Sequence, residues 1–231
     1  MILRDFKGLT SVPESRLLGQ APFRGTIRGH GGIVYSTSFS HDGTKIVSSS
    51  SDKTIHLWDT NSGSQIGQPL VGHTDAVYSV MFSLDDTLLV SASEDQTVRL
   101  WNVESREQIG RPLTGHNERV KSAVFSPDGK IVASGGRDKA IRLWDVHSRS
   151  PLREPLIGHK EWVESVTFSP DGKCLASASY DYTIRIWDVA SGLQVGEPFT
   201  GNRHYTFSVA FSPDGTRIVS ASGDISGSIR M

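Results

Sequence analysis

Histidine, serine, aspartate and tryptophan recur together, at fixed spacings, along this chain of 231 residues. The four sets are His30, Ser48, Asp52 and Trp58; His73, Ser91, Asp95 and Trp101; His116, Ser134, Asp138 and Trp144; and His159, Ser177, Asp181 and Trp187. A serine that passes its proton to a histidine oriented by an aspartate is the constellation of a nucleophilic hydrolase. Hydrolysis is therefore the first chemistry to weigh.

The serines of these sets do not have the surroundings of a nucleophile. Ser91 lies within Val-Ser-Ala and Ser134 within Ala-Ser-Gly, in the middle of short β-rich runs. A catalytic serine instead sits exposed on a strained turn, and four equivalent active sites in one small domain would be unusual. We therefore interpret the four sets as structural and expect the chain not to be an enzyme.

Other residues that could do chemistry also lack the pattern they would need. Cys174 stands at a repeat position that other copies fill with lysine, leucine, isoleucine or arginine, which does not indicate a nucleophile. The Gly-Lys pairs at 129–130 and 172–173 lack the other residues of a phosphate-binding loop. The remaining histidines share no zinc-ligand spacing with cysteines or carboxylates; they are His41, His56, His147 and His204. We predict no metal site and no cofactor.

All four sets follow one period of 43 residues, which indicates stacked structural copies. A Gly-His pair opens each set, and a degenerate Gly201–Asn202 continues the series. The turn sequence Ser-Pro-Asp-Gly recurs at 126–129, 169–172 and 212–215, with variants at 40–43 and 83–86. Proline presets φ and glycine accepts a positive φ, so these segments predict tight hairpins. Asp86 stands at the glycine position, where an aspartate adopts the left-handed region only at some cost.

Within one period the sequence reads as short strands joined by turns. In the second repeat the expected strands are Val77–Phe82, Leu88–Ala92 and Thr97–Trp101, followed by a looser segment from Gln108 to Leu113. Helical periodicity is absent, so the sequence predicts an all-β fold with four strands per period.

These motifs resemble the WD40 repeat family over about residues 29–230. The resemblance implies a β-propeller of four-stranded antiparallel blades arranged around a channel, with about five blade-equivalents here. It divides the chain into an N-terminal arm, 1–17, and a propeller, 18–231, with repeats starting near 29, 72, 115, 158 and 201. The close similarity of the copies is also like that of the regular WD40 arrays of fungal NACHT-type proteins.

The fifth repeat departs from the others, which raises the question of how the ring closes. Asn202 replaces the histidine, and Ile225-Ser226 lengthen the turn after Asp224. We expect Leu18–Arg28 to supply the outermost strand of the fifth blade, so that both ends of the chain complete a ring without an open edge. The alternative is a fragment of a larger array that pairs with another chain, which would make self-association an expected property.

The resemblance also assigns a role to the four recurring sets. In WD40 proteins each set forms a buried hydrogen-bond chain that runs from the indole N–H through the serine hydroxyl and the imidazole to the carboxylate. Buried indole and imidazole groups need such partners. The aspartate would also pin the turn that carries it.

Positions that vary among the copies, while their neighbours stay fixed, are free to serve recognition. Three such positions lie three and five residues after the histidine and one residue before the aspartate; in WD40 proteins they surround the channel mouth on one face. Aromatic residues and arginine are enriched at interface hot spots. The predicted partner-binding residues are Tyr35, Tyr78, Glu94, Arg119, Lys121, Arg137, Trp162, Glu164, Tyr180, Tyr205 and Phe207.

The resulting functional hypothesis is a non-catalytic scaffold that binds protein or peptide partners on the channel-mouth face. Arg119, Lys121 and Arg137 favour an acidic or phosphorylated segment as the ligand. One alternative is a propeller that binds carbohydrate or another small ligand through its aromatic residues. A second alternative is a propeller hydrolase that uses Glu94 and Glu164, although no paired-carboxylate geometry is indicated.

Bulk composition narrows the partners and the compartment. A net charge of −1 and a pI of 6.7 argue against nucleic acid and anionic membranes as partners. The apolar runs are too short for a membrane span. A single cysteine and a charged start to the chain fit the cytoplasm, with the nucleus as an open alternative.

Overall fold

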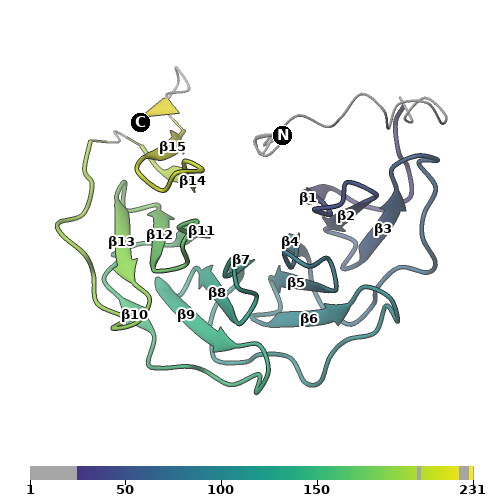
Figure 1. Cartoon of the computed structure of the whole chain (residues 1–231), viewed down its shortest axis with the longest axis horizontal. Coiled ribbons are helices and arrows are strands. Elements are labelled where there is room, and N and C mark those ends of the chain that lie inside the picture. The colour runs from purple at the N-terminus through teal and green to yellow at the C-terminus, as the bar shows by residue number, and fades with distance from the viewer. Residues whose placement is uncertain (1–24, 202–203, 224–228, 231) are drawn as a thin grey trace.

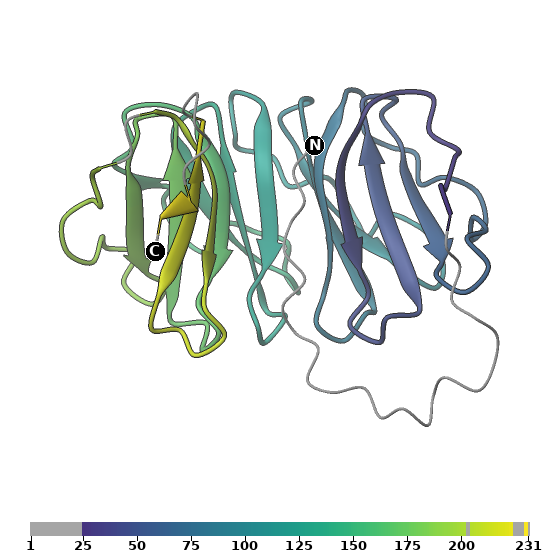
Figure 2. The same cartoon turned by 90° about the horizontal axis from the view of Figure 1, so that it is seen from above.

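The computed structural model describes residues 25–201, 204–223 and 229–230, and this part of the chain is all-β. Its strands form five antiparallel sheets that follow one another along an arc (Figure 1). Seen from above, the sheets stand side by side (Figure 2). The strands are β1 (Val34–Phe39), β2 (Lys45–Ser50), β3 (Ile55–Asp59), β4 (Val77–Phe82), β5 (Leu88–Ser93), β6 (Val98–Asn102), β7 (Val120–Phe125), β8 (Ile131–Gly136), β9 (Ala140–Asp145), β10 (Leu156–Ile157), β11 (Val163–Phe168), β12 (Cys174–Ser179), β13 (Ile184–Asp188), β14 (Thr206–Phe211), β15 (Ile218–Ser222) and β16 (Ile229–Arg230). The predicted fold class is confirmed to this extent.

Each 43-residue period forms one sheet whose strands follow chain order from the inside of the arc outward. The second repeat gives β4, β5 and β6, within a residue or two of the strands expected from the sequence. The predicted fourth strand is present as β10 in the third sheet, which has the order β10-β9-β8-β7. In the second repeat the same segment makes only isolated bridges, Val98 to Leu113 and Trp101 to Gln108. The four-strand prediction therefore holds for one sheet among the described residues.

Tight hairpins join the first two strands of each sheet, as the turn sequence predicts. The Gly129 N–H donates to the Ser126 carbonyl oxygen at 2.9 Å, and Gly129 has a φ of +71°. The Ser126 hydroxyl donates to the Asp128 carboxylate at 2.6 Å, which fixes the turn. Asp86 adopts the left-handed region with a φ of +58°, although it is not glycine. The sequence analysis anticipates this conformation from its place in the motif.

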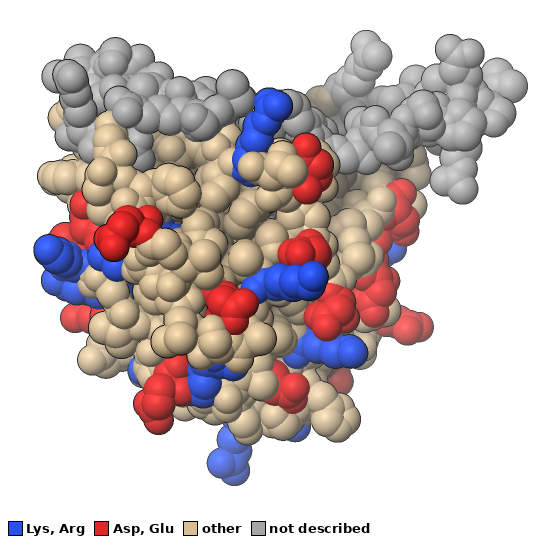
Figure 3. All heavy atoms as spheres, turned by 60° about the vertical axis from the view of Figure 1, so that its left-hand side comes forward, with Lys and Arg blue, Asp and Glu red and all other residues tan. Residues whose placement is uncertain are grey.

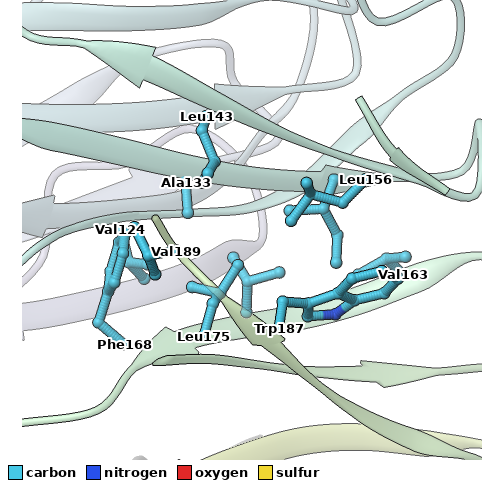
Figure 4. Packing of buried hydrophobic residues seen from close by; sticks show 11 residues of the cluster. Val124, Ala133, Leu143, Leu156, Val163, Phe168, Leu175, Trp187 and Val189 are labelled. Carbon is cyan, nitrogen blue, oxygen red and sulfur yellow. The ribbon is translucent and has the colours of Figure 1, made fainter. Parts of the chain in front are cut away.

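The hydrophobic core lies between neighbouring sheets. Figure 4 shows the junction of the third and fourth sheets, where Leu143 and Leu156 face Leu175 and Trp187 across the gap between the ribbons. The other three junctions hold equivalent clusters. Apolar side chains alternate along the strands. They are buried against the neighbouring sheets rather than against helices.

The two ends of the arc differ from its interior. Val77 of β4 is fully buried and Phe82 is 1% exposed, whereas the equivalent Val34 and Phe39 of β1 are each 46% exposed. Close packing of inner strands runs from β1 through β4, β7 and β11 to β14, and Figure 1 places the first and last sheets at opposite ends. Among the described residues, then, nothing packs on β1 as β1 packs on β4.

The predicted closure of the ring is not confirmed. Residues 18–24, most of the segment expected to complete the fifth blade, lie outside the described residues, and 25–28 form no strand. The predicted N-terminal arm, 1–17, also lies outside them. No helix in the described part is long and apolar enough to cross a membrane.

Candidate functional site

The second repeat brings its His, Ser, Asp and Trp side chains into one hydrogen-bond chain. The Trp101 indole N–H donates to Ser91 Oγ at 2.8 Å, and Ser91 Oγ lies 2.7 Å from His73 Nε2. His73 Nδ1 lies 2.8 Å from Asp95 Oδ2. Because a carboxylate only accepts, Nδ1 carries the proton, and Nε2 accepts the serine hydroxyl. The polar atoms of the chain are thereby satisfied.

The same chain is present in the first, third and fourth repeats, with equivalent distances between 2.7 and 2.9 Å. The serines are buried: Ser91, Ser134 and Ser177 have no exposed surface. Their hydroxyl protons are already donated to an imidazole inside the sheet. Substrate has no access to these oxygens, which supports the structural reading of the sets.

Ionisation within the chain follows from burial and hydrogen bonding. Burial opposes the charge on Asp95, yet hydrogen bonds from His73, Thr97 and the Thr74 N–H hold the pKa of this carboxyl well below its ordinary range. Burial also lowers the pKa of His73, more than Asp95 raises it. At neutral pH the pair is thus a carboxylate and a neutral imidazole.

The first repeat differs from the others at His56, for which the sequence predicts no metal-binding role. His56 stands where the later repeats have Arg99, Arg142 and Arg185, and it is buried against Trp58 with ring centroids 5.3 Å apart. One ligand atom each from His30, Asp52 and His56 lies within 4.8 Å of the others, a grouping that could hold a metal ion. In this structure His30 and Asp52 already bond to each other at 2.9 Å.

A β-bulge places one predicted recognition residue at the same point of every sheet. In each inner strand the pairing register shifts around the residue five positions after the histidine. A bulge twists the strand and re-aims the side chain at that point. The five bulge residues are Tyr35, Tyr78, Lys121, Glu164 and Phe207. All five line one hollow at the centre of the arc, together with Ser36, Thr37 and Ser208.

The other two variable positions are neighbours on each sheet. The backbone N–H of the residue before the turn aspartate donates to the carbonyl of the residue three after the histidine. Arg137 is thereby joined to Arg119 at 2.8 Å, and Tyr180 to Trp162 at 2.9 Å. The three variable positions of a repeat therefore lie close together at one end of its sheet, although they are far apart in sequence.

In the second and third sheets these side chains form charged and aromatic contacts. The Tyr78 hydroxyl donates to Glu94 Oε2 at 2.5 Å, and Arg119 Nη2 lies 2.8 Å from Glu94 Oε1. Burial and the Glu94 carboxylate raise the pKa of Tyr78 to about 12. Lys121 Nζ stands 3.9 Å from the centre of the Tyr78 ring, and the Tyr35 ring centroid lies 5.0 Å from that of Tyr78.

The three cations predicted to receive an acidic ligand each have an internal partner. Arg119 pairs with Glu94, Lys121 Nζ lies 3.7 Å from Glu164 Oε2, and Arg137 Cζ lies 3.8 Å from the centre of the Trp162 ring. Burial lowers the pKa of Lys121 and raises the pKa of Glu164, and the charges of this pair oppose both shifts. In the Arg119–Glu94 pair, the Arg119 side chain is the more exposed, at 40%.

Aromatic rings gather at the fourth and fifth sheets. Tyr180 lies at the middle of this group, with its ring centroid 5.0 Å from Trp162, 4.3 Å from Tyr205 and 5.6 Å from Phe207. The Tyr182 ring continues the group, 5.5 Å from Tyr205. Tyr182 is not among the residues predicted from the sequence. The signal that could have identified it is an aromatic side chain directly after the turn aspartate, where other repeats carry lysine or glutamine.

Charged side chains of both signs are mixed on the molecular surface seen in Figure 3. The face in that view has blue and red residues interspersed rather than a field of one sign. This agrees with the net charge of −1. No long-range field of one sign is therefore indicated by the charged side chains in this view.

Comparison with known proteins assigns the repeats. The family described as "WD domain, G-beta repeat" matches residues 22–59, 63–102, 107–145, 149–188 and 195–231. A stretch of 39 residues is 54% identical to the "Vegetative incompatibility protein HET-E-1" of Podospora anserina. That stretch is 17% of this chain and 3% of the fungal protein, so the chain matches only a small part of this relative. The five family matches together span most of the sequence, and the chain belongs to the WD40 repeat family.

Proposed function

We propose that this chain is a non-catalytic scaffold whose central face binds protein or peptide partners. The observation that carries the proposal is the ring of bulge residues, Tyr35, Tyr78, Lys121, Glu164 and Phe207, around one hollow. Their types differ from repeat to repeat, while the buried hydrogen-bond chain is the same in the first four repeats. A constant frame with variable tips on one face supports recognition rather than a shared chemical step.

The composition of this face also supports a macromolecular partner. Trp162, Tyr180 and Tyr205 supply large rigid surfaces that lose little conformational entropy on binding, and such residues dominate interface hot spots. Lys121 and Arg137 have internal partners. An acidic peptide would therefore reach only Arg119 among the three cations, and it would compete with Glu94 for it. We therefore propose a partner held mainly by aromatic contacts, inside the cytoplasm or the nucleus.

A hydrolytic function has less support. A glycosidase needs two carboxyl groups facing each other across the scissile bond. Among the described residues, Glu164 is the one acidic side chain that lines the central hollow, and Lys121 neutralises it. Glu94 is held by Tyr78 and Arg119 outside that lining.

Affinity capture from the source cells tests the scaffold, with the whole chain as bait. We expect partners that are retained by the native chain and lost when Trp162 and Tyr180 are both changed to alanine. Leu193→Ala is the matched control, because Leu193 is exposed on the outer segment after β13 and is not part of the central face. Partners captured equally by all three proteins would contradict the proposed face, and turnover of a glycoside that disappears in Glu164→Gln would contradict the non-catalytic role.

A further inference from the structure

A second hollow lies where the fourth sheet meets the fifth. Its volume is about 400 Å³, and its lining is Glu161, Trp162, Tyr180, Asp181, Tyr182 and Tyr205. Four of these six residues are aromatic, and the other two are acidic. Tyr182 and Tyr205 are each 43% exposed, so their rings are open to a ligand.

In the first and third repeats a lysine occupies the equivalent junction, and in the second repeat a glutamine stands at this position. Lys53 and Lys139 directly follow the turn aspartates, and their ammonium groups reach a backbone carbonyl of the next repeat, Thr74 O at 2.8 Å and Lys160 O at 2.7 Å. Tyr182 stands at the same position in the fourth repeat and has the same positive φ, +69°. In the fourth repeat, an aromatic ring therefore stands where the first and third repeats have a lysine ammonium group.

The molecule already uses two of its aromatic faces to hold cations. Arg137 Cζ lies 3.8 Å from the centre of the Trp162 ring, and Lys121 Nζ lies 3.9 Å from the centre of the Tyr78 ring. The face of a Trp or Tyr ring attracts a cation within about 6 Å of its centre. Tyr180, Tyr182 and Tyr205 offer further ring surface around the hollow.

Charges around the hollow nearly balance. Asp181 is ionised, because hydrogen bonds from His159, Thr183 and the Lys160 N–H outweigh the effect of burial and hold its pKa well below the ordinary range. Glu161 is shared with Lys139, 3.3 Å away, and Arg137 covers Trp162. A strongly hydrated ammonium would gain little from this field, whereas a methylated ammonium loses less hydration when it enters a cage of rings.

We propose that this hollow binds a methylated ammonium group, such as a trimethylated lysine side chain presented by a partner peptide. The proposal deepens the scaffold function above, and it rests on that function for the peptide. The rings of Trp162, Tyr180, Tyr182 and Tyr205 line the hollow, with Tyr180 and Tyr205 stacked on each other, and the cation would lie against this aromatic wall with Asp181 and Glu161 at its edge.

Titration of the whole chain with small probes tests the chemistry directly. The probes are capped trimethyl-lysine, its neutral tert-butyl carbon isostere, capped unmodified lysine and methyl glucoside, followed by calorimetry and by NMR of the aromatic resonances. We expect trimethyl-lysine to bind about tenfold more tightly than the neutral isostere, because only the charged group gains the cation–π attraction. Equal binding of the isostere, preferential binding of the glucoside, or binding of none of the probes would overturn the proposal.

Two variants at Tyr182 make the test specific. Tyr182→Lys restores the residue type that the first and third repeats carry at this position, so the turn is expected to fold, and it adds a like charge while it removes one wall. It should weaken trimethyl-lysine binding at least about tenfold, whereas Tyr182→Phe keeps the ring and should bind within about twofold of the native chain. Unchanged binding in Tyr182→Lys would contradict the site.

The outcomes separate this inference from the scaffold function. If the capture experiment loses partners on Trp162→Ala/Tyr180→Ala but the native chain binds no methylated ammonium, the scaffold stands and the cage falls. If trimethyl-lysine binds but those partners are retained by the double variant, the cage stands and the proposed docking face falls.

Discussion

The indole of Trp101 joins apolar packing to hydrogen bonding. Its rings fill the junction with the first sheet, where Val47, Ile55 and Leu57 lie, and its N–H is satisfied by Ser91. A buried indole without a partner for its N–H would lose part of what its burial contributes. The serine therefore lies inside the strand because the tryptophan needs an acceptor there, and not because a substrate needs a nucleophile.

Truncation of a tryptophan should cost more inside the arc than at its end. Trp144→Ala removes a fully buried ring from the cluster between the second and third sheets, and we expect a loss of about 3–5 kcal/mol in the free energy of unfolding. Trp58 belongs to the first sheet, whose free side meets no other sheet among the described residues, so Trp58→Ala should cost at least about 1 kcal/mol less. Urea unfolding followed by circular dichroism measures both. Equal losses would show that burial of the ring, 4% exposed at Trp58 and 1% at Trp144, sets the cost rather than the neighbouring sheet.

Acid should destabilise the fold through the buried imidazoles first and the carboxylates second. Burial lowers the pKa of His56 and His73 below the ordinary value of about 6.5, so below that pH the unfolded chain takes up protons first and stability falls. The pKa of Asp95 is also lowered, so its contribution is present above about 3.8 and is lost as pH falls further. Both effects have the same sign.

The variant His56→Arg isolates one of these groups. Arginine is the residue of the other three complete repeats at this position, and in the second repeat Arg99 bonds to Gln108 and lies 3.7 Å from Asp95. Thermal melts between pH 7.5 and 4.5 should therefore show a shallower loss of stability in His56→Arg than in the native chain. An unchanged slope between pH 6.5 and 5 would show that His56 does not contribute to it.

The recurring sets could be predicted from the sequence, whereas the aromatic group around Tyr180 could be predicted only in part. All members of a set lie within one 43-residue period, and four copies reinforce the same pattern. Tyr182 and Tyr205 belong to different repeats, and their contact depends on how one sheet is rotated against the next. No short-range pattern in the sequence carries that rotation, so Tyr182 was missed, while Trp162, Tyr180 and Tyr205 were identified as variable positions.

The same limit applies to whole strands. β4 and β5 begin where the sequence predicts, because turn residues bound them and alternating apolar side chains fill both sheet junctions. The outermost segment has contacts on one side only, and pairs such as Trp144 with Pro151 lack the run of hydrogen bonds that defines a strand. A proline cannot donate to a neighbouring strand, which suits an edge position. Edge segments are thus the least determined by sequence.

Two residues that differ from those of other repeats couple the first hairpin to the second. Asp86 accepts hydrogen bonds from the backbone N–H groups of His41 and Asp42, at 2.7 and 2.9 Å. His41 can donate because it stands where the third, fourth and fifth repeats have proline, which has no N–H. The aspartate in place of glycine in one turn therefore fits the histidine in place of proline in the turn before it.

Asp86→Gly should destabilise the protein in spite of the left-handed backbone. Glycine relieves a strain of about 1 kcal/mol, but the substitution removes two charge-assisted hydrogen bonds of about 1.5 kcal/mol or more each, reduced by partial exposure. We expect a net loss of about 1 kcal/mol in urea unfolding and faster amide exchange at His41 and Asp42. His41→Pro should give a similar loss, and the double variant should cost less than the sum of the two. Additive losses would argue against the coupling.

Across the whole molecule, each junction between sheets joins the same two kinds of surface. Val90 and Ala92 of the second sheet pack against Val120 and Phe125 of the third, and the other junctions repeat this arrangement. The first sheet presents one of these surfaces at Val34, which is exposed. The last sheet presents the other at Val219 and Ala221, which are partly exposed. The two ends of the arc therefore expose the two kinds of surface that pack together at each internal junction.

Complementary surfaces at opposite ends predict head-to-tail association of the chain. Such a contact is heterologous, and each added copy leaves one end open until a ring closes, so light scattering should show an average mass that rises with concentration. Val34→Lys should hold the chain as a monomer, because a charge would be desolvated at the contact. The stability of the monomer should change by no more than about 0.5 kcal/mol, since Val34 is exposed.

The matched control is Val71→Lys, a substitution at an equally apolar and more exposed residue, 73%, that lies outside the sheet junctions. It adds charge to the surface without touching β1 and should associate like the native chain. If Val71→Lys also dissociates the assemblies, general repulsion and not the β1 surface controls them. If the native chain is a monomer at every concentration, the β1 surface is covered within the chain, and the predicted closed ring, rather than the open arc, describes the molecule in solution.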